Sequence, residues 1–186
     1  CAYRPIACTP ALAVLDRRLR GKTITGVSRL GKRVILETDR WGLVLQPKMT
    51  GLVTIEAPPD PEHVRLVLEL SGVSVPKLTF WDRRGLGTIL LLERDQIESQ
   101  LVIGKLGKDA LAISVDEFAA GLAATRRPIK VALLDQKIVA GVGNLYASEM
   151  LHAAGIDPHR SAAEIDRIVG IPFAENSGNT MYQEQK

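Results

Sequence analysis

The spacing of apolar residues changes along this chain, from an alternating pattern in the first half to a helical pattern in the second. Before the alternation begins, Leu12, Leu15 and Leu19 lie on one side of a predicted helix over residues 11–20. From Lys22 to about Glu93 apolar and polar residues alternate, which predicts strands because successive side chains of a strand point to opposite faces. Seven short strands are expected, over residues 23–28, 33–38, 43–45, 52–55, 64–70, 78–81 and 88–92.

Glycine and proline separate most of these strands, at Gly31, Gly42, Gly51, Pro58-Pro59, Gly72 and Gly85-Leu86-Gly87. Seven short strands in succession favour a β-sandwich or a barrel. After Gln96 the apolar spacing becomes helical, and helices are expected over residues 115–124, 129–137 and 145–154. We therefore expect the α+β class, with an N-terminal antiparallel β-sandwich over residues 1–103 and a helical domain over residues 104–186.

Charge is distributed unevenly over a chain whose net charge is only +3. Residues 1–50 contain ten lysines and arginines against three acidic residues, a net charge of +7, and the remainder carries −4. A basic surface of this kind suits a polyanionic partner, although an unevenly charged solvated surface explains the same counts. No apolar run is long enough to span a membrane and residues 1–10 show no leader pattern, so a soluble cytoplasmic protein without membrane contact is expected.

The cysteines give no sign of a metal site. Cys1 and Cys8 are the only two, they stand seven positions apart, and they form no CxxC motif. No histidine stands at ligand spacing from them. We interpret both as small apolar residues, and we expect no disulfide framework, no metal site and no cofactor in this chain.

Residues 128–151 predict two packed helices joined by a glycine-rich turn. The first helix has one stripe that comprises Ile129, Ala132, Leu133 and Gln136. Gly141 and Gly143 permit a tight backbone turn, and Asn144 is placed to cap the second helix. The exposed amides of such a helix start can bind a DNA phosphate near Gly143 and Asn144, with Lys130 and Lys137 adding positive charge. An ordinary helix hairpin that uses glycine for its turn is the alternative.

Two arginines precede the first of these helices and bear on that alternative. Arg126 and Arg127 stand at the predicted helix N-terminus, where cations oppose the helix dipole. Helix stability therefore explains them poorly, whereas a polyanionic ligand would explain them.

The sequence around this turn carries the most specific pattern in the chain, made of Ile129-Lys130, Leu134-Asp135-Gln136, the run Ala140-Gly-Val-Gly-Asn-Leu-Tyr-Ala-Ser-Glu149, and Ala154-Gly-Ile. This pattern resembles the helix-two-turn-helix of the formamidopyrimidine-DNA glycosylase and endonuclease VIII family, and the resemblance extends over residues 3–160. It implies a base-excision-repair glycosylase with AP lyase activity that removes oxidised purines, such as 8-oxoguanine and formamidopyrimidines, from duplex DNA. Damaged double-stranded DNA is then the expected partner, and a monomer is the expected state.

The resemblance also implies roles for two residues of the β-half. Lys32, in the pair Gly31-Lys32, takes the position of a lysine at the lesion pocket, and we expect partial burial beside Val34 and Leu36 to lower its pKa. Met49 takes the position of a side chain that fills the space left by the everted nucleotide. Without the resemblance, Lys32 would be interpreted as a lysine reaching into water and Met49 as core filler.

The loop after the sixth predicted strand resembles the family segment in which an arginine addresses the base opposite the lesion. Arg83 takes that position and Arg84 adjoins it, although a surface ion pair with Asp82 is the alternative. The family usually has phenylalanine after this pair, where the present chain has Gly85-Leu86. His63 matches a family position near the DNA backbone, or is simply a residue at a strand end.

Features of both ends of the family pattern are not found in this sequence. Family members begin with a proline whose amine attacks C1′ of the damaged nucleotide, followed by a glutamate, and they end in a zinc ribbon. Neither segment is matched here, so zinc is expected only in a full-length family member. We expect either a fragment of an active enzyme or a catalytically inactive damaged-DNA-binding module, and Cys1 is not expected to replace the nucleophile. A structural nucleic-acid-binding protein is a third possibility, which the family order of Lys32, Met49 and the arginine pair disfavours.

Overall fold

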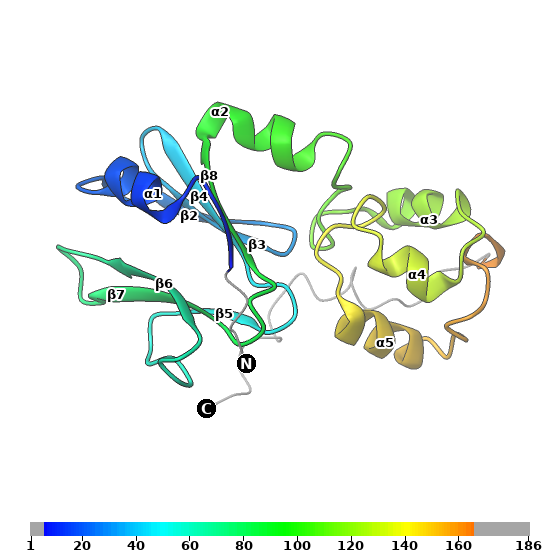
Figure 1. Ribbon diagram of the computed structural model, residues 1–186. Coiled ribbons are helices and arrows are strands. Elements are labelled where there is room, and N and C mark those ends of the chain that lie inside the picture. Colours follow the sequence, from blue (N-terminus) through cyan, green and yellow to red (C-terminus); the bar gives the residue numbers. More distant parts are fainter. Residues whose placement is uncertain (1–5, 166–186) are drawn as a thin grey trace. The chain divides into compact units, whose positions relative to one another are not determined.

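Two sheets and two short helices make up the first part of the chain. The computed structural model describes residues 6–165, and the chain divides into two units between Gln100 and Leu101 (Figure 1). The first sheet has the order β1-β8-β4-β3-β2 and the second the order β5-β7-β6. The strands are β1 (Ala7–Thr9), β2 (Gly26–Leu30), β3 (Arg33–Glu37), β4 (Trp41–Gln46), β5 (Gly51–Thr54), β6 (Val64–Glu69), β7 (Lys77–Asp82) and β8 (Thr88–Glu93).

All seven predicted strands are present, and the predicted α+β class with an N-terminal β-sandwich is confirmed. The sheets differ from a purely antiparallel arrangement at one place, because β1 pairs in parallel with β8. Strand β1 was not predicted, since three residues are too few to establish an alternating pattern.

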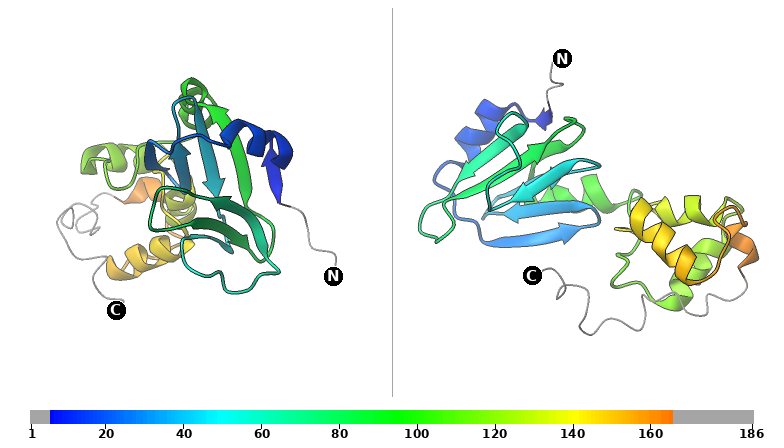
Figure 2. Two further views of the ribbon diagram at one scale, coloured as in Figure 1. Left: turned by 90° about the vertical axis from the view of Figure 1, so that its left-hand side faces the viewer. Right: turned by 90° about the horizontal axis from the view of Figure 1, so that it is seen from below.

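The core of the first unit lies between the two sheets, which are seen from further sides in Figure 2. Leu43 on β4 pairs with Leu36 on β3 and with Leu91 on β8, so one row of leucines crosses the first sheet. Phe80 of β7 enters the same core from the second sheet and is fully buried. Alternation therefore places Leu36, Leu43 and Leu91 in this core, whereas Ile35 and Val44, next to them in sequence, are also buried but do not belong to it.

Helix α1 (Leu12–Leu19) covers one end of this core with Leu15, its only buried residue. The guanidinium of Arg18 lies 4.6 Å from the ring centre of Trp41, and that of Arg40 lies 4.9 Å from it. The Arg18 contact links α1 to β4, and the two cation–π contacts together engage two of the basic residues of the N-terminal segment in packing. After β8 the chain forms α2 (Arg94–Ile97) and a π-helical turn over Glu98–Val102, neither of which the sequence predicted.

The second unit contains α3 (Val115–Ala123), α4 (Ile129–Leu134), α5 (Asn144–Ala153) and a 3-10 turn over Ala162–Glu164. Its core is apolar and includes the fully buried Leu122, Ile129 and Leu133. Helix α4 ends three residues earlier than predicted, because Asp135 leaves the helical conformation and its carboxylate accepts the N–H of Lys137 at 3.0 Å. Gly155 follows α5 with a φ of +63°, the left-handed conformation that ends a helix.

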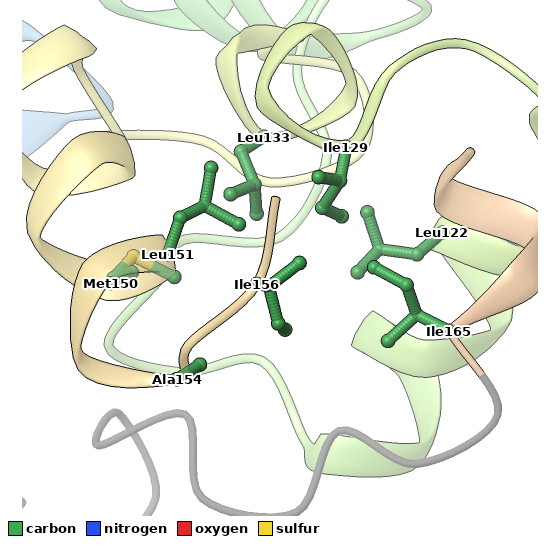
Figure 3. A pocket seen from close by; sticks show the side chains of 8 residues that line it. All are labelled: Leu122, Ile129, Leu133, Met150, Leu151, Ala154, Ile156 and Ile165. Carbon is green, nitrogen blue, oxygen red and sulfur yellow. The ribbon is translucent and has the colours of Figure 1, made fainter. Parts of the chain in front are cut away.

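A small pocket lies among the helices of this unit (Figure 3). Its lining is entirely apolar and comprises Leu122, Ile129, Leu133, Met150, Leu151, Ala154, Ile156 and Ile165. Because it offers no hydrogen-bonding group, it is a gap in the packing and has no place in the candidate site.

Candidate nucleic-acid interface

The turn between α4 and α5 is held by one side-chain amide. Gln136 Nε2 donates to the carbonyl oxygens of Val142 at 3.0 Å and Leu134 at 3.1 Å, and its Oε1 accepts the N–H of Gly141 at 3.0 Å. Three backbone groups of the turn are thereby satisfied by a single residue. The sequence interpretation placed Gln136 on one stripe of the first predicted helix and missed this role, which only the path of the turn reveals.

The start of α5 differs in one respect from the prediction. Gly143 is the N-cap, with extended backbone, and Asn144 is already the first helical residue and makes no capping bond. The prediction that Asn144 caps the helix is therefore wrong, because a cap residue must have non-helical dihedral angles and Gly143 has them. Asn144 is exposed at a helix terminus whose first amides have no partner within the helix, which is an arrangement suited to a phosphate.

Arg127 and Lys130, which lie just before and within the first turn of α4, have different environments. Arg127 Nη2 pairs with Asp135 Oδ2 at 2.7 Å, so folding explains this arginine without a polyanion, contrary to the sequence interpretation. Bonds from the Lys137 N–H and from Arg127 lower the pKa of Asp135. Lys130 is half-buried on α4, and its backbone N–H donates to Pro158 O at 3.3 Å.

In the first unit, two loops project the predicted DNA-contacting side chains. The Met49 loop, residues 47–50, joins β4 to β5, and the arginine loop, residues 83–87, joins β7 to β8. Met49 is 78% exposed, which excludes a role as core filler. Arg84 Nη1 lies 3.9 Å from Met49 Sδ, so the two loops bring a thioether and a guanidinium together at the surface.

The arginine pair is exposed, and the alternative of an ion pair with Asp82 does not describe it. The Asp82 carboxylate accepts the backbone N–H of Arg84 at 3.2 Å, and the salt bridges among residues 6–165 include neither guanidinium. Of the two arginines, it is Arg84 that contacts Met49, whereas the sequence interpretation assigned the base-addressing position to Arg83.

Lys32 lies in the turn between β2 and β3, one residue before the strand on which the sequence interpretation placed it. Gly31, with a φ of +56°, turns the chain there and is itself buried. Lys32 is exposed, and partial desolvation lowers its pKa, in the expected direction.

His63 is held by more than its position at a strand end. Its Nδ1 lies 2.7 Å from Asp60 Oδ1, and its backbone N–H donates to the same oxygen at 3.0 Å. The imidazole also meets the Trp81 ring edge to face, with the ring centres 5.7 Å apart. Asp60 therefore fixes the orientation of the imidazole, a contact that the sequence interpretation did not foresee.

Comparison with known proteins gives a consistent match in both units. A model of the formamidopyrimidine-DNA glycosylase N-terminal domain matches residues 3–89, and a model of the formamidopyrimidine-DNA glycosylase H2TH domain matches residues 106–168. The formamidopyrimidine-DNA glycosylase of Moorella thermoacetica is 40% identical over 170 residues, which are 88% of this chain and 61% of that protein. This chain belongs to the formamidopyrimidine-DNA glycosylase family.

Other members of the family show the same extent of similarity. The formamidopyrimidine-DNA glycosylase of Azorhizobium caulinodans is 34% identical over 188 residues, covering 92% of this chain and 64% of that protein. The structure of Lactococcus lactis Fpg in complex with abasic-site DNA superposes with a TM-score of 0.71 at 33% identity, over 82% of this chain and 57% of that one. The chain thus spans about three fifths of the length of these formamidopyrimidine-DNA glycosylases.

Two further features of this family member concern metals and membranes. Within residues 6–165, no three histidine, cysteine, aspartate or glutamate side chains lie close enough together to hold a metal ion. None of the helices in that range has the length and apolarity needed to cross a membrane. Cys1 lies outside the described residues, and Cys8 is half-buried as a free thiol.

Proposed function

We propose that this chain acts in base-excision repair as the lesion-recognising part of a DNA glycosylase, on duplex DNA that contains oxidised purines such as 8-oxoguanine and formamidopyrimidines. The observation that carries the proposal is the contact between Met49 and Arg84 at the surface. An enzyme that acts on a stacked base must extrude it, and an apolar side chain that takes its place offsets the lost stacking. Met49 supplies that side chain, and the guanidinium of Arg84 can bond to the edge of the base left opposite.

The remaining candidate residues are assigned either to the lesion pocket and its surroundings or to the DNA backbone. Lys32, whose pKa is lowered, is assigned to the lesion pocket, and Arg83 adds charge beside Arg84. Lys130, Gly143 and Asn144 are assigned to phosphates at the start of α5, and His63 is assigned to the DNA backbone. The solved structures of Lactococcus lactis Fpg with abasic-site DNA and with FAPY-dG DNA support lesion-containing DNA as the partner.

The reaction we propose for the complete protein is glycosylase and AP lyase chemistry. An amine attacks C1′ of the damaged nucleotide as the C1′–N bond to the base breaks, and the proton that the amine loses balances the proton taken up by the departing base. The C1′–O4′ bond of the sugar ring then opens, O4′ takes up a proton, and the amine nitrogen and C1′ form a protonated Schiff base. Removal of a C2′ proton then expels the 3′ phosphate by β-elimination. A DNA-binding module that recognises the lesion without cleaving the strand is the alternative, and it uses the same residues.

Borohydride trapping on duplexes containing 8-oxoguanine or an abasic site, with binding followed in parallel, tests this proposal. A covalent complex would show that an amine of this chain forms the Schiff base, and its loss in Lys32→Ala would assign that amine. Binding that favours the lesion without trapping would support the non-cleaving alternative. Equal binding to damaged and undamaged duplexes would contradict the proposed function in both forms.

A further inference from the structure

Asp82, the last residue of β7, is fully buried at 0% exposure. Its Oδ1 accepts the hydroxyl of Thr50 at 2.7 Å and the N–H of Arg84 at 3.2 Å, and its Oδ2 accepts the N–H of Gly87 at 2.7 Å. Thr50 belongs to the Met49 loop, and the other two donors belong to the arginine loop. One buried carboxylate thus joins the two loops that project Met49 and Arg84.

The ionisation state of Asp82 follows from these donors. Burial by itself raises the pKa of a carboxyl group, but the bonds from Thr50 and from the backbone amides of Gly87 and Arg84 outweigh it and leave the pKa of Asp82 below its ordinary value. The group is therefore an anion at neutral pH. A carboxylate only accepts hydrogen bonds, so it orients all of its donors toward itself.

The backbone around Asp82 is shaped for this network. A Cβ at Gly87 would lie 2.7 Å from Phe80 Cζ and 3.1 Å from Asp82 Oδ2, so only glycine brings its amide this close. Thr50 Oγ1 also accepts the N–H of Arg84 at 3.3 Å, which closes a three-membered network between the loops. On the far side, the Asp82 carbonyl accepts Arg65 Nε at 2.9 Å, which ties the end of β7 to β6.

We propose that Asp82 is a positioning residue for lesion recognition, which acts through Thr50 and the Arg84 backbone to hold Met49 and Arg84 side by side before DNA binds. The inference rests on the proposed function, because the two side chains must enter the duplex together. An insertion element that is ordered in advance loses less conformational entropy on binding, so rigid loops favour the extruded state of the nucleotide. Asp82 itself touches no DNA.

The test compares Asp82→Asn, Thr50→Val and Thr50→Ser in the full chain. Asparagine keeps the shape of Asp82 but places an N–H₂ group where acceptor oxygens are needed, and valine removes the Thr50 hydroxyl at nearly constant volume. Serine restores that hydroxyl. Asp95→Asn removes the same charge from an exposed position on α2 and serves as the matched control.

The readouts are affinities for abasic-site and undamaged duplexes, and the fluorescence of 2-aminopurine placed opposite the lesion, which reports local unstacking. We expect Asp82→Asn and Thr50→Val to lower affinity for the lesion duplex by about tenfold, equivalent to about 1.4 kcal/mol. The affinity of each variant for undamaged duplex should stay near the wild-type value. The controls Thr50→Ser and Asp95→Asn should also bind the lesion duplex with nearly wild-type affinity. In a Met49→Ala background the effect of Thr50→Val should shrink, because Thr50 acts through the Met49 loop.

The outcomes separate the two hypotheses. If Thr50→Val, which alters only a half-buried residue, folds and retains full lesion preference and fluorescence change, the positioning role is overturned while the proposed function stands. The same holds if lesion and undamaged duplexes lose affinity equally. If the wild-type chain shows no lesion preference, the proposed function fails and the positioning role falls with it.

Discussion

Arg84 Nη1 lies 3.9 Å from Met49 Sδ, across two loops that are 35 positions apart in the sequence. Neither side chain is required by the core, because both are exposed at the surface of the first unit. Single exposed apolar residues are common on protein surfaces, so it is the contact of Met49 with Arg84, and not its exposure alone, that points to a function. The contact between Met49 and Arg84 is explained if both side chains enter DNA together.

Met49→Ala should reduce lesion preference with little effect on folding. The side chain is 78% exposed, so its truncation should change the free energy of unfolding by less than about 0.5 kcal/mol. Affinity for an abasic-site duplex should fall more than affinity for undamaged duplex, because the apolar insertion is made only where a nucleotide is extruded. Urea denaturation and paired binding titrations check the two parts. An equal loss for both duplexes would contradict this role.

Lys130→Ala should weaken binding to every duplex and lower the salt dependence. A lysine that neutralises one phosphate contributes about 0.9 to the slope of log K against log salt concentration, and this contribution should disappear. Titrations at several salt concentrations measure it. Lys77→Ala serves as control, because Lys77 lies at the end of β7 opposite to Asp82. An unchanged slope in Lys130→Ala would remove this residue from the phosphate contacts.

Gln136→Ala should destabilise the turn before α5. The substitution leaves the Gly141 N–H and the Val142 carbonyl without their partner, and each unsatisfied buried group costs about 1–3 kcal/mol. We expect a lower free energy of unfolding in urea, together with weaker binding to damaged and undamaged duplexes alike, since the start of α5 is no longer fixed. Wild-type stability in Gln136→Ala would show that water replaces the amide.

Acid should reduce the stability that Asp82 provides. A carboxyl group whose pKa is lowered by folding contributes stability above its unfolded pKa, near 3.9, and this contribution is lost as the pH falls through the lower folded value. At pH 7, Asp82→Asn should therefore be less stable than wild type, and the difference should narrow below about pH 4. Urea denaturation at pH 7, 5 and 3 measures it, with Asp95→Asn as control. If the two proteins differed in free energy of unfolding by the same amount at all three pH values, the ionised carboxylate would not be the source of that stability.

Much of the fold follows from the local pattern of apolar residues. The features that were predicted wrongly or not at all include a very short strand and a helix boundary, which this pattern does not determine. Alternating apolar residues predicted seven strands and the helical spacing predicted four helices, because both patterns reflect burial of one face. The three-residue β1 is formed by pairing with β8, a distant strand that no local pattern reveals. Asn144 was misplaced by one residue, the usual uncertainty at a helix boundary.

Some residues of the candidate site could likewise be proposed from the sequence, and others could not. Met49, His63, Lys32 and the arginine pair could be proposed through a family resemblance, and the direction of the Lys32 pKa shift was correct although the residue lies in a turn. Asp82 and Gln136 were not proposed as site residues, because their roles consist of bonds to backbone groups several positions away. Asp82 accepts the N–H of Gly87, and Gln136 accepts the N–H of Gly141 within its own turn. Such contacts depend on how the chain closes in space, which residue type and spacing do not encode.

The most direct test of the account is a competition titration of this chain between a duplex with one abasic site and the same duplex undamaged. The account predicts a preference of about tenfold or more for the damaged duplex, equivalent to about 1.4 kcal/mol or more, and loss of most of that preference in Met49→Ala. Equal affinity of the wild-type chain for the two duplexes would contradict it.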